Sequence, residues 1–208
     1  MEFTQHTFPP ENTVYIAPTW EQLHELAFTV SSKLRESNHK FDRIVTLAKG
    51  GWPMSRSVVD FLQVPEVASV GIKFYKGINA RFSEPQVYQD LPIAIQGESI
   101  LLFDDVADSG ESLEFAQTYL RQRGVGSVTT ATLFFKPHSK VRPDYFGATT
   151  DAWIIFPYEV VDTINVLGNR WQAAGVSPEV CVQRFLVLGF PANHIATYWG
   201  KTRSSDER

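Results

Sequence analysis

The chain has 208 residues, of which 43% are hydrophobic and 20% charged, and its formal net charge is −4. This length suits one α/β domain with a small appendage, and the acidic balance excludes the basic face with which proteins usually hold nucleic acid. No apolar run approaches the ~18 residues of a membrane span, and Cys181 is the only cysteine, which excludes an internal disulfide.

Residues 1–13 have neither a basic start nor an apolar run, so we expect a loose arm and no signal peptide. Together with the single cysteine, this favours a reducing, cytoplasmic location. A helix is predicted over residues 21–36, because apolar residues recur there on one face: Leu23, Leu26, Val30 and Leu34.

Strands and helices then alternate along the chain. Continuous apolar runs, typical of strands covered on both faces, occupy residues 43–48, 100–103 and 128–135, and residues 67–75 are a fourth candidate. Helical patterns at 53–62 and 113–123 separate them. This alternation predicts an α/β fold with a central parallel sheet of about five strands flanked by helices. In such a sheet, ligands bind beyond the carboxyl ends of the strands.

Residues 77–98 lack a clear pattern. They contain two prolines and two glycines and are of mixed polarity. A weakly patterned segment of this length is often a lid that closes over a site. A β-hairpin arm with ordinary surface turns is the alternative, and the two are compatible.

The most informative segment is residues 100–113, Ile-Leu-Leu-Phe-Asp-Asp-Val-Ala-Asp-Ser-Gly-Glu-Ser-Leu. A buried strand brings Asp104 and Asp105 to the edge of the sheet, and a turn of small residues leads into the next helix. Free amides at a helix start bind phosphate, while carboxylates suit ribose hydroxyls or a hydrated Mg²⁺. The segment therefore predicts a site for a phosphorylated sugar. Capping of a helix by the acidic pair is the alternative.

This pattern resembles the signature of the type I phosphoribosyltransferases: a hydrophobic strand, two acids, two small or apolar residues, then Asp-Thr/Ser-Gly-x-Thr/Ser. The resemblance implies that Asp104 and Asp105 hold the ribose hydroxyls and Mg²⁺. It also implies that Asp108 contacts N7 of a base and moves its proton. The 5′-phosphate of phosphoribosyl pyrophosphate would be bound by the surrounding loop, that is by Ala107, Ser109, Gly110, Glu111 and Ser112.

One position departs from the family pattern. Residue 111 is often Lys or Gly in these loops, whereas this chain has Glu111. An acid beside a bound phosphate repels it, so we expect Glu111 to contact the phosphate through its backbone amide alone, with the carboxylate pointing outward.

A second element is Leu47-Ala-Lys-Gly-Gly51, which follows the first core strand and is similar to the pyrophosphate loop of the family. The resemblance implies that Lys49 and Gly50 direct amides at pyrophosphate. It also implies that the peptide bond between Lys49 and Gly50 is strained. Whether this non-proline bond is cis or trans is left open. Taken alone, Lys-Gly-Gly is an ordinary tight turn. Neither a Walker A nor a Gly-x-Gly-x-x-Gly pattern is present.

The third element concerns the base. The stretches around Lys136, at the end of a core strand, and around Trp153 and Ile154 look like those of bacterial xanthine-guanine and hypoxanthine phosphoribosyltransferases. The resemblance implies that Lys136 donates to the 6-oxo group of a purine and that Trp153 stacks on its ring. Taken singly, Trp153 is typical of an aromatic residue in the core, and Lys136 is typical of a solvated charge at the end of a strand.

The predicted organisation is a phosphoribosyltransferase domain over residues 1–167, followed by a helical extension with a disordered end over residues 168–208. The resemblance adds a small hood, built from the N-terminal arm and residues after about 150. In the extension, a helix is predicted at 178–188 and a shorter one within 189–200. Relatives commonly form dimers or tetramers, so we expect a homodimer or homotetramer.

The expected activity is purine salvage: a nucleoside 5′-monophosphate and pyrophosphate are made from phosphoribosyl pyrophosphate and hypoxanthine, guanine or xanthine, with Mg²⁺. A regulator of the same fold that senses phosphoribosyl pyrophosphate without turnover is the main alternative. A receiver-type signalling domain is disfavoured, because its acidic pair follows the first strand and not a later one.

Overall fold

The computed structural model describes residues 1–76 and 83–199. The chain divides into two compact units, one of residues 21–151 and the other of residues 1–20 and 152–208. The sequence-based boundary at residue 168 falls inside a helix of the second unit, α4 (Val160–Ala173).

A six-stranded sheet forms the centre of the larger unit. Its strands are β3 (Arg43–Ala48), β4 (Glu66–Lys76), β5 (Ser83–Gln89), β6 (Ser99–Ala107), β7 (Ser127–Phe135) and β8 (Tyr145–Thr149), in the order β5-β4-β3-β6-β7-β8. Five neighbouring strands run parallel, and only β5, at the edge, is antiparallel to its neighbour. The predicted α/β class and the parallel core are confirmed.

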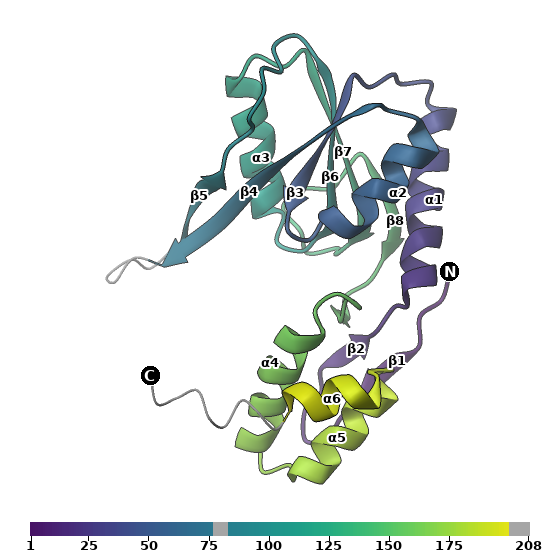
Figure 1. Cartoon of the computed structure of the whole chain (residues 1–208), viewed down its shortest axis with the longest axis vertical. Coiled ribbons are helices and arrows are strands. Elements are labelled where there is room, and N and C mark those ends of the chain that lie inside the picture. Colours follow the sequence, from purple (N-terminus) through teal and green to yellow (C-terminus); the bar gives the residue numbers. More distant parts are fainter. Residues whose placement is uncertain (77–82, 200–208) are drawn as a thin grey trace. The chain divides into compact units, whose positions relative to one another are not determined.

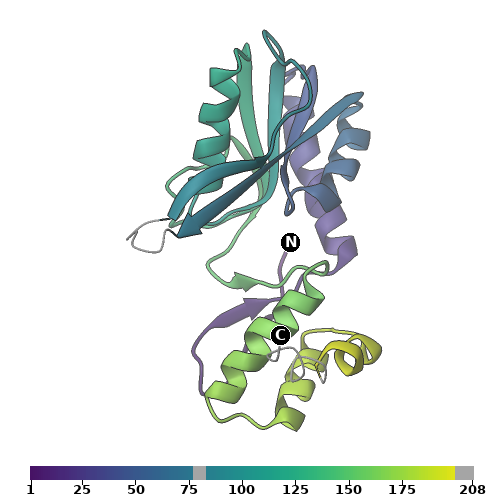
Figure 2. The same ribbon diagram turned by 60° about the vertical axis from the view of Figure 1, so that its left-hand side comes forward.

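Helices cover both faces of this sheet. The helices α1 (Trp20–Glu36) and α2 (Trp52–Leu62) lie on one face and α3 (Glu111–Gln122) on the other (Figures 1 and 2). The apolar stripe of α3 packs on inward-facing residues of β3, β4 and β6 in one buried cluster, which includes Leu113, Ala116, Leu120, Val45, Leu47, Val70, Ile100 and Leu102. Coverage on both faces explains why the central strands are continuously apolar.

The strand order places a topological switch in the middle of the sheet. The chain passes from β3 through α2 to β4 on one side, and from β6 through α3 to β7 on the other. The connections that follow β3 and β6 therefore leave the sheet in opposite directions. This is where open α/β sheets bind ligands.

The segment 77–98, for which a lid and a hairpin were both considered, is partly described. Residues 83–89 form β5, which pairs antiparallel with β4 and places Ile72 opposite Val87. The described residues therefore form a hairpin arm. The predicted lid movement concerns in part residues 77–82, which lie outside the described residues.

The smaller unit combines a three-stranded sheet with three helices. Its strands are β1 (Gln5–Thr7), β2 (Val14–Ile16) and β9 (Trp153–Ile154), in the order β1-β2-β9, and its helices are α4, α5 (Pro178–Val187) and α6 (Ala192–Tyr198). Trp171, Phe185 and Tyr15 are fully buried in its core. The prediction of a loose arm over residues 1–13 was wrong in part, because β1 pairs with β2.

Among the described residues, no helix is both long enough and apolar enough to span a membrane.

Candidate functional site

The acidic pair lies near the end of β6, beside the turn that follows β3. Asp105 is only 7% exposed, and Asp104 is partly buried. The amide of Asp105 donates to Oδ1 of Asp104 at 3.0 Å. Because β3 and β6 are adjacent parallel strands, their last residues meet at the switch point of the sheet.

Residues 48–51 form the turn that closes on this pair. A Cβ atom on Gly50 would lie 2.5 Å from Oδ2 of Asp105, and one on Gly51 would lie 2.4 Å from Oγ1 of Thr46. Both positions therefore require glycine, since a side chain would displace the turn from the acidic pair. The predicted pyrophosphate turn and the acidic pair are thus brought together.

One detail of the turn differs from the prediction. The cis non-proline peptide joins Ala48 to Lys49, whereas the family resemblance placed the special peptide between Lys49 and Gly50. β3 ends at Ala48, as predicted, and the cis peptide is the bond that follows this last strand residue. Lys49 is exposed, and its carbonyl accepts a hydrogen bond of 3.1 Å from the amide of Trp52 at the start of α2.

Burial raises the pKa of the Asp104 carboxyl well above its usual range, and the neighbouring charge of Asp105 raises it further. Hydrogen bonds from the amides of Asp105 and Gly51 act in the opposite direction. A charged aspartate that is buried and lies next to another acidic residue destabilises the folded state at neutral pH. The arrangement is suited to a ligand that brings hydroxyl donors or positive charge.

Asp104→Asn should therefore raise the melting temperature at pH 7 in the absence of substrate and metal. A raised pKa in the folded state means that the carboxyl favours folding in acid and that this contribution is lost as pH rises. The gain from the substitution should thus grow from pH ~4, near the pKa of an unfolded aspartate, to pH 7. Asp60→Asn on the exposed face of α2 is the control, and equal gains at both pH values would contradict this account.

The loop after β6 leads directly into α3. Gly110 has φ +83° and precedes the first helical residue, Glu111, whose amide donates a hydrogen bond to Oγ of Ser109. Ser112 follows in the first helical turn, where amides have no partner within the helix. The segment predicted to bind phosphate therefore has the amide-rich helix start that anions prefer.

A neighbouring turn, residues 136–141, supports this loop. The amide of Lys136 donates to the carbonyl of Ala107 at 3.0 Å, and the amide of Lys140 donates to that of Ser109 at 2.9 Å. A Cβ atom on Gly110 would lie 2.6 Å from Oγ of Ser139, so the positive φ and this close approach both require glycine.

The carboxylate of Glu111 is turned toward this supporting turn. Its Oε1 lies 2.9 Å from Nζ of Lys140, and this contact raises the pKa of the lysine. The acidic charge at this unusual position of the loop is therefore paired with a cation on the neighbouring turn.

Asp108 also meets basic side chains of this turn. Its Oδ1 lies 3.4 Å from Nζ of Lys136 and 2.9 Å from Nε2 of His138. Asp108 and Lys136, two residues predicted separately for the site, are thus brought together, whereas His138 was not predicted. The signal was present in the Lys-Pro-His-Ser-Lys segment, because loops after adjacent parallel strands lie side by side.

Trp153 and Ile154 belong to the other compact unit, where they form β9. Ile154 is buried, but Trp153 is 43% exposed and is therefore not a core residue of this unit. Its ring lies 6.4 Å from that of Tyr15 and 5.9 Å from the guanidinium of Arg170. The role of both residues in a base pocket stays a prediction.

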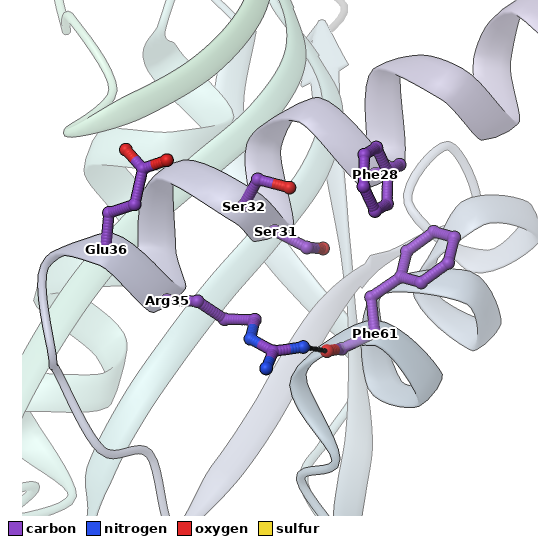
Figure 3. Close-up of a pocket in the computed structure, with 6 residues that line it drawn as sticks. All are labelled: Phe28, Ser31, Ser32, Arg35, Glu36 and Phe61. Carbon is purple, nitrogen blue, oxygen red and sulfur yellow. Dashed lines mark hydrogen bonds between the residues drawn. The ribbon is translucent and has the colours of Figure 1, made fainter.

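A separate hollow of about 330 Å³ lies between α1 and α2. The rings of Phe28 and Phe61 both line it and contact each other edge to face, with their centroids 5.4 Å apart, and Arg35 donates to the carbonyl of Phe61 (Figure 3). It lies near the last turns of both helices, toward the amino ends of the strands, and no predicted site residue lines it. The hollow is therefore distinct from the site at the carboxyl ends.

The sequence model of the phosphoribosyl transferase domain family matches residues 19–163 of this chain. These residues include the turn at 48–51, the acidic pair and the loop that leads into α3. The chain belongs to this family. Phosphoribosyl transfer is a pentosyltransferase activity, and its substrate carries the diol, phosphate and diphosphate groups for which these loops were predicted.

Individual relatives agree with this assignment. The xanthine-guanine phosphoribosyltransferase of Gluconobacter oxydans (strain 621H) is 27% identical over 152 residues, which cover 72% of this chain and 88% of that protein. The enzyme of the same name from Ruegeria sp. (strain TM1040) is 28% identical over 163 residues, covering 73% and 88%. The crystal structure of a purine phosphoribosyltransferase from Pyrococcus horikoshii has a TM-score of 0.63 and is 29% identical, covering 71% of this chain and 94% of that one.

Proposed function

We propose that the protein is a 6-oxopurine phosphoribosyltransferase, which makes a nucleoside 5′-monophosphate and pyrophosphate from phosphoribosyl pyrophosphate and hypoxanthine, guanine or xanthine. The observation that carries the proposal is the packing of the turn at residues 48–51 against Asp105, with the helix start of α3 next along the chain. These elements supply binding groups for a diphosphate, a ribose diol and a 5′-phosphate. The names of the relatives support a purine as acceptor and give the regulator alternative no support.

In the proposed reaction, bond formation and bond breaking occur at the anomeric carbon of the ribose. A ring nitrogen of the purine supplies the electron pair for the new bond, and the electron pair of the broken C–O bond leaves with pyrophosphate. The transition state resembles an oxocarbenium ion, as in other glycosyl transfers. Asp104 and Asp105 hold the ribose hydroxyls, and Asp108 accepts the proton at N7 of the base.

The acidic pair fits a magnesium ion that is held mainly by the substrate. Carboxylate oxygens are preferred ligands of Mg²⁺. Burial and, after it, the charge of Asp105 raise the pKa of Asp104, and a bound cation would favour the charged carboxylate. In residues 1–76 and 83–199, no group of three or more His, Cys, Asp or Glu side chains could hold a metal. Asp104 and Asp105 would therefore hold the ion together with substrate oxygens and water. When bound, Mg²⁺ would neutralise charge on the departing diphosphate.

Ser112→Ala should weaken binding of phosphoribosyl pyrophosphate by about 1–2 kcal/mol, because the hydroxyl would lose a hydrogen bond to a charged phosphate. Titration calorimetry with this substrate and Mg²⁺ measures the loss. Ser127→Ala, at the amino end of β7, removes a hydroxyl from the opposite edge of the sheet and should leave the affinity unchanged. Equal losses in both variants would contradict a role for Ser112 in phosphate binding.

A panel of bases tests the proposed substrate class. Steady-state kcat/KM should be measured for hypoxanthine, guanine, xanthine, adenine and uracil, with saturating phosphoribosyl pyrophosphate and Mg²⁺. The proposal predicts turnover of at least one 6-oxopurine and much lower values for adenine and uracil. A preference for adenine or uracil would overturn the 6-oxopurine assignment and leave family membership intact.

A further inference from the structure

His138 approaches the carboxylate of Asp108 from the same side as Lys136. Both basic groups contact Oδ1, at 2.9 Å for Nε2 of His138 and 3.4 Å for Nζ of Lys136. Within the described part of the chain, every polar side-chain contact of Asp108 is made through Oδ1. The second oxygen, Oδ2, is therefore left for a substrate.

The backbone holds His138 in this position. Hydrogen bonds from the amides of Lys136 and Lys140 to the carbonyls of Ala107 and Ser109 tie the turn to the loop on both sides of His138. The amide of Ser139 donates to the carbonyl of Lys136 at 2.9 Å, which closes the turn around it. The contact is thus built into the scaffold, although the imidazole is itself exposed.

The two basic groups have different roles once a purine is bound. The contact of Lys136 with Asp108 is the longer one, and its ammonium is the group that we assign to the 6-oxo oxygen of the base. If the ammonium turns to that oxygen, Asp108 keeps His138 as its side-chain partner. A carboxylate can only accept hydrogen bonds, so Nε2 of His138 carries the hydrogen.

We propose that His138 is a positioning residue for Asp108: its Nε2–H fixes Oδ1, so that Oδ2 faces N7 of the purine when Lys136 turns to the 6-oxo group. This proposal rests on the proposed function. His138 exchanges no proton with the substrate, and its effect on the reaction passes entirely through Asp108.

A set of substitutions at residue 138 tests this role. His138→Ala should lower kcat by about 10-fold while KM for phosphoribosyl pyrophosphate stays unchanged, because loss of alignment affects the chemical step. The amide nitrogen of glutamine can occupy the place of Nε2, whereas that of asparagine is closer to the place of Nδ1. His138→Gln should therefore recover most of the lost kcat, and His138→Asn should not. His39→Ala, an exposed histidine before β3, is the control and should match the wild type.

A double variant separates this inference from the proposed function. In an Asp108→Asn background, His138→Ala should have no further effect on kcat, because an amide at position 108 takes no proton from the purine and its alignment no longer affects the chemical step. The role of His138 is overturned if the wild type transfers phosphoribosyl groups but His138→Ala has normal kcat. It is also overturned if the losses of kcat in the two single variants multiply in the double variant. If the wild type forms no nucleotide from any base, the proposed function itself fails.

Discussion

Asp108→Asn should lower kcat by about 10²-fold or more, with little change in the affinity for phosphoribosyl pyrophosphate. Asparagine has nearly the same shape and can still accept hydrogen bonds from Lys136 and His138 through its carbonyl oxygen. It cannot take a proton from the purine. The loss should therefore fall on the chemical step, which presteady-state mixing of enzyme and substrates measures separately from product release.

The control for this variant is Asp60→Asn, which removes a carboxylate that pairs with Arg56 on the exposed face of α2. It should retain wild-type kcat. A near-normal chemical step in Asp108→Asn would show that another group receives the proton, and the assignment of Asp108 would then be wrong.

Lys136→Ala should reduce kcat/KM for hypoxanthine and guanine by about 10- to 100-fold, as expected when a hydrogen bond from a charged donor is lost. The ammonium can donate but cannot accept, so it favours a 6-oxo group over the amino group of adenine. Its side chain is only 13% exposed and lies beside Asp108. The position of the ammonium is therefore restricted, whereas that of a solvent-exposed lysine would not be. The ratio of 6-oxopurine to adenine activity should therefore fall along with the absolute rate.

Two comparisons make this result specific. Trp153→Ala should weaken all bases together, because stacking on a flat ring does not distinguish a 6-oxo from a 6-amino group. Lys40→Ala removes a lysine from the exposed loop before β3 and should change neither rate nor ratio. An unchanged ratio in Lys136→Ala would contradict its role in the choice of base.

The central sheet could be predicted because its strands are buried on both faces. Continuous apolar runs such as residues 43–48 and 128–135 have few other structural explanations, and the structure extends them by a residue or less. The strands β1, β2 and β9 have only two or three residues each. Segments this short show no measurable periodicity, and tertiary pairing decides them.

The candidate site was predictable where it follows one continuous segment. Residues 100–113 bring the strand, the acids and the helix start together in order, so local sequence is sufficient. His138 was missed because its contact with Asp108 depends on two strands lying side by side, with Ala107 opposite Phe135. The special peptide of the turn was predicted one bond too late, at Lys49–Gly50, because the residue types in Lys-Gly-Gly do not identify which bond of the turn is cis.

The most direct test of this account is a ³¹P NMR time course with the purified protein, phosphoribosyl pyrophosphate, Mg²⁺ and hypoxanthine or guanine. The account predicts that the substrate signals decline while pyrophosphate and a nucleoside 5′-monophosphate appear in equal amounts, and that omission of the base stops the reaction. Consumption of phosphoribosyl pyrophosphate without nucleotide, or no consumption with any purine, would contradict it.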